Sequence, residues 1–427
     1  MFLLKGGRVI DPGSNVDDYL DVLIDGEKIV KIGKKLQADA EVINAEGLVV
    51  APGFIDVHCH FRDPGQTHKE DLNTGAMAAA KGGYTTVVCM ANTSPVVDNQ
   101  EILRYVLEKA RKLPIEVLQV AAVTKNLEGK ELTDMRALKE TGAVGFSDDG
   151  KSILNPDVAL EAMRKALELD VPLSFHEEDP RLIGVPGINE GPIAKQLGLC
   201  GAMRESEDVL VARDVVLALS TGARVHIQHL SSKTSVDIIR WAKSKGARVT
   251  AEVTPHHFSF TEEMVLSMGT NAKMNPPLRT EEDRKALLEG LRDGTIEIIA
   301  TDHAPHSAEE KSVDFEKAPS GVIGLETALS AAITFLVKPG LLSLNEVLKK
   351  LTVNPAKLYS LDRGCIKEGS KADLVLFDPD EKWVVQKFAS KSANSPFLGM
   401  SLYGRVKMTI CGGKIVYEDI GEQGDLQ

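Results

Sequence analysis

Two histidines that stand one residue apart are the first feature of this chain that could do chemistry. Residues 56–65 read DVHCHFRDPG, with His58 and His60 on either side of a cysteine. Alternate residues of a β-strand point to the same side, so both imidazoles would face one way and Cys59 the other. Such a pair at the end of a strand is a good chelate for zinc or another borderline metal. We therefore predict a metal site here.

Other potential ligands end or follow further short apolar runs. His176, His229 and Asp302 are single residues in such positions, and Asp148 and Asp149 together follow another run. Four of the chain's 10 histidines thus occupy strand ends, which chance placement explains poorly. We predict that histidines and aspartates from five strands share one metal centre.

Each of these residues also has an ordinary structural alternative. The sequence GFSDDG fits a turn, and from the residues alone either Asp148 or Asp149 could be the ligand. His226 lies three residues before His229 and would face the other side of a strand; we choose His229 because it is nearer the strand's end. Asp302 could cap a helix, or it could bind a metal and accept a proton from the water that the metal activates.

The elements that must position these residues follow a regular pattern. Eight apolar, β-branched runs are predicted as strands: 54–60, 85–91, 116–123, 143–147, 172–177, 224–230, 248–254 and 297–301. Helical patterns lie between them, for example at 73–81, 100–112, 157–169, 208–220 and 281–292. This alternation predicts a parallel (β/α)8 TIM-type barrel, in which reactive groups gather at the C-terminal ends of the strands.

The two ends of the chain read differently from its middle. Residues 1–53 and 364–427 hold short strands and turns, and KGGRVI near the start resembles CGGKIV near the end. We predict one small β-sandwich domain built from both termini, around a catalytic barrel of residues 54–363. A Gly/Pro-rich insertion at 179–200 could cover the site.

Composition excludes several classes of protein. The net charge is −12, which argues against nucleic-acid binding. No apolar run approaches the length of a membrane span, and the N-terminus lacks the apolar core of a signal peptide. The five cysteines are scattered and never form a CxxC pair, which favours free thiols in a reducing cytoplasm.

Taken together, the chain resembles the amidohydrolase superfamily over essentially its whole length. Within it, PGFIDVHCHFRDPG, MANTSP, GFSDDG, NPPLR and ATDHAPH are similar to dihydroorotases of the long bacterial class. Many relatives, including hydantoinases and allantoinases, carry after strand four a carbamylated lysine that bridges two metals. The aspartates of GFSDDG stand there instead, as in this class of dihydroorotase, and one or two zinc ions both stay open.

The resemblance implies an activity and a set of roles. It implies interconversion of N-carbamoyl-L-aspartate and L-dihydroorotate in pyrimidine biosynthesis, with Asp302 as the proton shuttle. It favours Asp149 over Asp148 as the carboxylate ligand. Arg62, two residues after His60, matches a substrate carboxylate in two-point geometry. The further residues implied to contact substrate are His60, Asn92, Asn275, His306, Ser320 and Gly321.

Two alternatives and several partners accompany this interpretation. The closest rival is another cyclic amidase, an allantoinase or hydantoinase. A rival of another class is a non-catalytic, dihydroorotase-like scaffold subunit of aspartate transcarbamoylase, which would lack metal ligands that this chain has. We expect a homo-oligomer, and the resemblance implies a complex with aspartate transcarbamoylase. The polar loop after His306 is expected to act as a lid.

Overall fold

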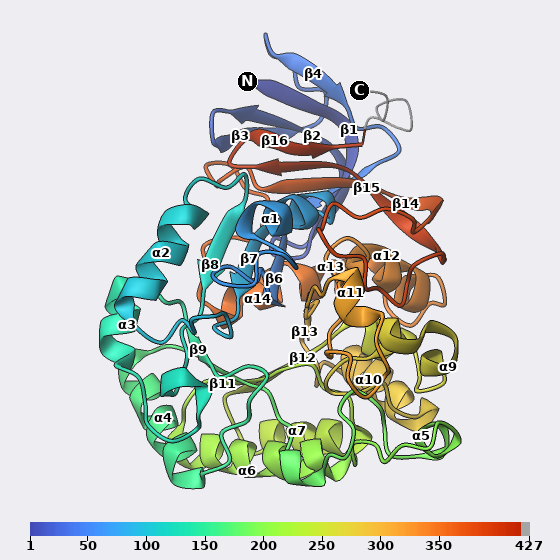
Figure 1. Cartoon of the computed structure of the whole chain (residues 1–427). Coiled ribbons are helices and arrows are strands. Elements are labelled where there is room, and N and C mark those ends of the chain that lie inside the picture. The colour runs from blue at the N-terminus through green and yellow to red at the C-terminus, as the bar shows by residue number, and fades with distance from the viewer. Residues whose placement is uncertain (420–427) are drawn as a thin grey trace.

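Short parallel strands from the middle of the chain surround the centre of the molecule. The structure is a computed structural model that describes residues 1–419 (Figure 1). One parallel sheet has the order β6-β7-β8 and a second has the order β9-β10-β11-β12-β13. Their bounds are β6 Phe54–Cys59, β7 Tyr84–Cys89, β8 Glu116–Gln119, β9 Phe146–Ser147, β10 Leu173–Phe175, β11 Val225–Ile227, β12 Val249–Val253 and β13 Ile298–Ile299. The chain is thus mixed α/β with parallel sheets.

Isolated bridges span both gaps between the two parallel sheets. Ala121, just after β8, pairs in parallel with Phe146 of β9. On the other side, Cys59 of β6 pairs in parallel with His303, which follows β13. The same side is held by the amide of His60, which donates to the carbonyl of His303 over 2.9 Å.

Helices separate these strands and form the outer layer (Figure 1). The predicted helices are present to within a few residues, and several begin at a side chain that caps them, such as Asp71 before α1 and Thr280 before α10. The helices are α1 Leu72–Lys81, α2 Gln100–Ala110, α3 Met135–Thr141, α4 Pro156–Leu169, α5 Pro192–Gln196, α6 Glu205–Thr221, α7 Lys233–Ser244, α8 Pro255–Ser259, α9 Met264–Met268, α10 Glu281–Asp293, α11 Ala308–Lys311, α12 Ala328–Ala332, α13 Leu344–Leu351 and α14 Val353–Leu358. Short 3-10 or π turns are η1 Lys125–Leu127, η2 Pro180–Leu182, η3 Gly269–Ala272 and η4 Ile333–Val337.

The predicted strands are too long, and the error lies mainly at the end that carries the polar residues. Extended pairing stops before His60, His176, His229 and Asp302. His229 and Asp302 have φ of 30° and 44°, so the backbone turns where the prediction continues the strand. Apart from His58, which lies within β6, the predicted ligands therefore lie on the first residues after the strands.

Strands from both ends of the chain form one sheet above the parallel strands. Its order is β16-β15-β14-β5-β1-β2-β3, with β4 paired to β1. The link between the two ends is the antiparallel pair β5 and β14. The bounds are β1 Phe2–Asp11, β2 Val16–Asp25, β3 Lys28–Gly33, β4 Glu41–Asn44, β5 Val49–Pro52, β14 Leu374–Val384, β15 Ser401–Cys411 and β16 Lys414–Glu418. Hydrogen bonds thus join strands from both ends of the chain into one continuous sheet, which is consistent with the predicted β-sandwich of both termini.

Alternating residues of this sheet serve two cores. Leu374 and Leu376 belong to a core within the sheet, whereas Val375 and Phe377 pack into the large core of the parallel strands. The similar stretches KGGRVI and CGGKIV both lie in this sheet but occupy different places in it. Gly6 and Gly7 lie inside β1 at a register shift, whereas Gly412 and Gly413 form the turn between β15 and β16.

None of the helices in residues 1–419 is long and apolar enough to cross a membrane.

The predicted insertion at 179–200 contains η2 and α5 and is held by main-chain bonds, such as that from the amide of Val185 to the carbonyl of Cys200 over 2.7 Å.

Candidate metal centre and active site

The structure brings all six predicted metal ligands together at one end of the parallel strands. Three overlapping groups have donor atoms close enough to share an ion, and each group is fully buried. They are His58 with His60 and Asp149, His58 with His229 and Asp302, and Asp149 with His176 and His229. We call these six residues the ligand cluster.

Asp149 lies at the centre of the ligand cluster. Its carboxylate oxygens lie 3.2 Å from Nε2 of His58 and 3.3 Å from Nε2 of His60. On the other side, Oδ1 lies 3.7 Å from Nδ1 of His176 and 3.8 Å from Nε2 of His229. Asp149 therefore faces two histidine pairs at once, which is the position that a bridging ligand would need.

The hydrogen bonds of His58 show that the ligand cluster fits a cation. Nδ1 of His58 lies 2.6 Å from the buried carboxylate of Glu252, which can only accept, so Nδ1 carries the proton. Nε2 of a neutral His58 then presents a lone pair to Oδ1 of Asp149, and within residues 1–419 neither atom makes a hydrogen bond. Two facing acceptors need a positive ion between them, either a metal ion or, in its absence, a proton. Histidine and carboxylate donors suit zinc and its neighbours in the transition series.

The pKa values within the ligand cluster point the same way. Burial lowers the pKa of His58, but Asp149, Glu252 and Asp302 together raise it well above its ordinary value. Burial raises the pKa of Asp302, but His58, His60 and His229 lower it below its usual range. The cluster therefore stabilises positive charge, and Asp302 is a carboxylate at neutral pH.

The paired histidines differ in charge. Burial, together with His176 and His58, lowers the pKa of His229 to about 3. Burial also lowers that of His176, but Asp149 and Glu178 raise it to about 10. Nδ1 of His176 lies 2.8 Å from Nε2 of His229, so the two rings share one proton. With a metal bound, each of these two nitrogens would instead turn a lone pair to the metal.

A cavity of about 400 Å³ lies next to the ligand cluster, a volume typical of a small-molecule site. All the predicted substrate residues line this cavity, and so do five of the six metal ligands. We call the substrate residues that are not metal ligands the loop wall: Arg62, Asn92, Asn275, His306, Ser320 and Gly321.

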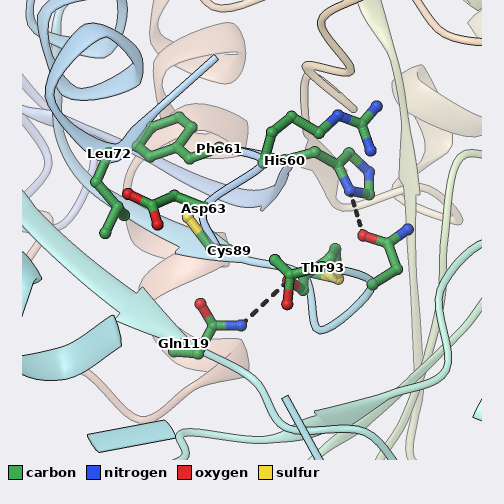
Figure 2. Close-up of a pocket in the computed structure, with 10 residues that line it drawn as sticks. His60, Phe61, Asp63, Leu72, Cys89, Thr93 and Gln119 are labelled. Carbon is green, nitrogen blue, oxygen red and sulfur yellow. Dashed lines mark hydrogen bonds between the residues drawn. The ribbon is translucent and has the colours of Figure 1, made fainter. Parts of the chain in front are cut away.

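His60 joins the ligand cluster to the loop wall. Its Nε2 lies 3.0 Å from Oδ1 of Asp302, and its Nδ1 donates to Oδ1 of Asn92 over 2.9 Å. Figure 2 shows this second bond and the ring of Phe61 turned to the other side of the chain, where it packs in the apolar core. Asn92 in turn donates to Asp149 over 3.2 Å, so one amide side chain orients two of the predicted ligands.

Arg62 is the only arginine that lines this cavity among the described residues, and only 9% of its surface is exposed. Its Nε donates to the carbonyl of Pro305 over 3.3 Å, and Nη2 lies 3.5 Å from Nε2 of His306. Burial lowers the pKa of Arg62, although Asp302 and Asp149 act in the opposite sense. A guanidinium has five N–H donors, so most of them stay available for a ligand in the cavity.

The remaining predictions about this region have clear outcomes. Asp148 does not join the ligand cluster; its carboxylate accepts from the amides of Val123 and Thr124 over 2.7 and 3.0 Å and orders that loop. His226 is turned away from the cluster and lies 3.0 Å from Glu252. The loop after His306 is ordered: the ammonium of Lys311 donates to the carbonyls of Pro319 and Gly321 over 2.9 and 3.0 Å.

Sequence reasoning missed two residues that hold the site together. Glu252 accepts from His58 and from the amide of His229, and it contacts His226. A glutamate inside the apolar strand RVTAEVT was the available signal, because a fully buried carboxylate needs partners. Lys69 lies 3.3 Å from Nδ1 of His306, and nothing in its surroundings in the sequence marks it.

Comparison with known proteins identifies the family. Residues 47–235 match the family model described as dihydro-orotase-like, and residues 324–417 match the amidohydrolase family. The chain is 60% identical to the dihydroorotase of Clostridium acetobutylicum over 423 residues, which are 98% of this chain and 100% of that protein. It is 59% identical to the dihydroorotase of Clostridioides difficile over 419 residues, again 98% of this chain and 100% of that protein.

Solved structures of related cyclic amidases superpose on the whole chain. The L-hydantoinase of Arthrobacter aurescens matches with a TM-score of 0.87 at 26% identity, covering 98% of this chain and 96% of that one. The dihydropyrimidinase of Brevibacillus agri matches with a TM-score of 0.85 at 26% identity, covering 97% and 95%. The chain belongs to the dihydroorotase family and is an amidohydrolase that acts on cyclic amides.

Proposed function

We propose that this chain is a zinc-dependent dihydroorotase that interconverts N-carbamoyl-L-aspartate and L-dihydroorotate in pyrimidine biosynthesis. The observation that carries the proposal is that one cavity joins the ligand cluster to a buried arginine. Metal ligands alone would suit any cyclic amidase of the superfamily. A guanidinium beside them adds a binding site for a free carboxylate, which dihydroorotate carries.

Zinc is the proposed metal, bound by His58, His60, Asp149, His176, His229 and Asp302 as one or two ions per subunit. The central place of Asp149 is compatible with either number, since Oδ1 lies near His58, His176 and His229 and Oδ2 lies near His60. Bound zinc would supply the Lewis acidity that activates a water and polarises the amide carbonyl.

Asp302 is the proposed proton shuttle. In the hydrolytic direction the water oxygen adds to the ring carbonyl carbon, and Asp302 accepts the proton that the water loses. Asp302 then gives this proton to the ring nitrogen as the carbon–nitrogen bond breaks. Its lowered pKa keeps it ionised, and its contact with His60 at 3.0 Å orients the carboxylate. In the synthetic direction the same steps run in reverse.

The loop wall is proposed to bind the substrate. Arg62 and Asn92 would hold the carboxylate, and His60 would lie beside the reacting ring. Asn275 would contact the ring: its buried Oδ1 has no hydrogen-bond partner within residues 1–419. His306, Ser320 and Gly321 would close the opposite side, and the loop between them would act as a lid.

The same proposal covers architecture and partners. We infer that the two parallel sheets close into one (β/α)8 barrel of residues 54–363, supported by the bridges at both gaps. Residues 1–53 and 364–427 would form one composite domain, although residues 420–427 lie outside the described part.

The enzyme would be a cytoplasmic homo-oligomer, and it would form a complex with aspartate transcarbamoylase. The five free cysteines favour a reducing compartment.

A hydantoinase-like activity is the second candidate, because the two solved structures described above are of such enzymes. Asp149 stands where those relatives are expected to carry a carbamylated lysine, and Arg62 has no role in binding an uncharged hydantoin. A non-catalytic scaffold would need missing ligands, whereas all six are present.

The test is metal analysis of the purified enzyme beside turnover of dihydroorotate, carbamoyl aspartate, hydantoin and allantoin, with and without aspartate transcarbamoylase. We expect one or two zinc ions per chain and turnover of the first two compounds. Turnover of allantoin or hydantoin alone would overturn the proposal.

A further inference from the structure

A segment from the C-terminal part of the chain forms part of the cavity's support. Residues 388–397, between β14 and β15, leave the terminal sheet and contact loops around the site. Oγ of Ser392 donates to the carbonyl of Lys69 over 2.8 Å. Ser390 donates to the buried carboxylate of Glu70, which lies 3.4 Å from Nε2 of His303. This segment therefore reaches the loops that follow β6 and β13.

Asn394 has the most connections in this segment. Its Oδ1 accepts from the amide of His306 over 3.2 Å. Its Nδ2 donates to the carbonyls of Ala304 and Gly321 over 3.1 and 3.0 Å. Its main-chain carbonyl accepts from the amide of Ile323 over 2.9 Å. One buried side chain thus joins the segment that carries His306 to the segment that carries Gly321.

We propose that Asn394 is a positioning residue for substrate binding: it sets the spacing between these two segments of the loop wall. The proposal rests on the proposed function, in which His306, Ser320 and Gly321 contact the carboxylated ring. Asn394 itself does not line the cavity, so its effect on the substrate must pass through its neighbours. It adds to the site a residue that lies outside residues 54–363.

The hydrogen-bond chemistry is specific to an amide side chain. The two carbonyls need a donor and the amide of His306 needs an acceptor, and asparagine supplies both. Aspartate at this position would turn a second acceptor toward the carbonyls of Ala304 and Gly321. Alanine would leave all three groups unpaired in a buried place, while the main-chain bond to Ile323 would persist.

The experiment compares Asn394→Asp and Asn394→Ala with Ser395→Ala in the full-length enzyme. Ser395 is a matched control because it is buried next door and its Oγ accepts only from the nearby amide of Phe397, over 3.2 Å. We expect KM for L-dihydroorotate to rise about ten-fold in both Asn394 variants, with a smaller change in kcat and unchanged zinc content. Hydrogen exchange should quicken over residues 304–323, and Ser395→Ala should behave as the wild type.

The outcomes separate this proposal from the function on which it rests. A wild-type enzyme that does not turn over dihydroorotate refutes the proposed function, whatever the variants do. With an active wild type, a KM within two-fold of normal in Asn394→Ala refutes the positioning role. So does a fall in kcat and zinc content at constant KM, since that pattern would mean general damage. If Asn394→Asp does not fold, Asn394→Ala decides alone.

Discussion

The ligand cluster and the loop wall meet in one cavity but are held in place in different ways. The ligand cluster consists of side chains at the ends of short parallel strands or on the first residues after them, and buried groups such as Glu252 fix their rings. Three of the six loop-wall residues, His306, Ser320 and Gly321, follow β13, and the side chains of Lys311 and Asn394 donate to a main-chain carbonyl there. In the proposed function, chemistry is thus placed on the rigid elements and substrate selection on the loops.

This difference says what each side can tolerate. A ligand on a strand end has little freedom, so its replacement should remove activity rather than shift specificity. A loop residue that binds the substrate contributes to KM, and its loss should leave the metal in place. The predictions below separate these two expectations, and they run from the largest effect to the smallest.

Replacing Asp302 by asparagine should produce the largest loss. The asparagine side chain has the shape of aspartate, but its amide cannot take up the proton from the water, so kcat should fall by roughly 10²- to 10⁴-fold. Zinc content should stay near that of the wild type because the other ligands remain. Steady-state kinetics and metal analysis on the same sample measure both, and near-normal turnover would rule out Asp302 as the proton shuttle.

The adjacent aspartates give a matched pair of variants. Asp149→Asn should lose zinc and activity together, because Asp149 faces both histidine pairs. Asp148→Asn should keep zinc and activity but lower the melting temperature, since its carboxylate accepts two amide bonds in the fold. Weakening such charge-assisted bonds costs about 1.5–3 kcal/mol. The reverse pattern would show that the two assignments must be exchanged.

Glu252→Gln should weaken metal binding without a change in KM. The glutamate holds the proton of His58 on Nδ1 and so keeps Nε2 free for the metal. Loss of such a partner typically costs about 10- to 100-fold in metal affinity. Chelator competition measures this, with Glu297→Gln as the control, since Glu297 accepts from Ala251 of the same strand. Equal metal affinity in the two variants would count against the role of Glu252.

The smallest effect is on stability at acid pH. Burial, together with Arg62 and Lys69, lowers the pKa of His306 to about 3. The unfolded chain binds this proton below about pH 6.5, but the native chain does not, so His306 makes stability fall as pH drops from about 6.5 toward 3. Above pH 6.5 it has no effect. The full slope is about 1.4 kcal/mol per pH unit.

Urea unfolding of the metal-free enzyme between pH 7 and pH 5 can detect this contribution. His306→Gln removes the titrating group and should give a shallower dependence of the unfolding free energy on pH. The other buried histidines titrate equally in both proteins, so the difference isolates His306. Identical slopes would mean that His306 keeps an ordinary pKa in the native state.

The sequence predicts the ligand cluster far better than the support around it. His58 and His60 form a recognisable pair, and His176, His229 and Asp302 each stand at the end of an apolar run, so position in the chain carries the information. The supporting residues have no such position. Asn394 in SANSPF fits a turn equally well, and only the folded chain brings it to Ala304, 90 residues away in the sequence.

Strand ends were the weak point of the prediction for a physical reason. Apolar runs continue past the last paired residue because the first turn beyond a strand is buried too: Met90, Ala91 and Val123 are almost fully covered. Periodicity cannot separate a buried strand from a buried turn. The sequence also does not reveal the register of the terminal sheet. The glycine pairs of KGGRVI and CGGKIV look alike in the sequence, but one pair lies inside a strand and the other forms a turn.

The division of labour between the two sides of the cavity can be measured with one ratio. This is kcat/KM for L-dihydroorotate divided by kcat/KM for 5,6-dihydrouracil, the same ring without the carboxylate, in the wild type and in Arg62→Met. We expect the wild type to favour dihydroorotate strongly, and the variant to lose roughly ten- to a hundred-fold of that preference with unchanged zinc content. An unchanged ratio, or a loss of zinc with Arg62, would contradict the separation of chemistry from selection.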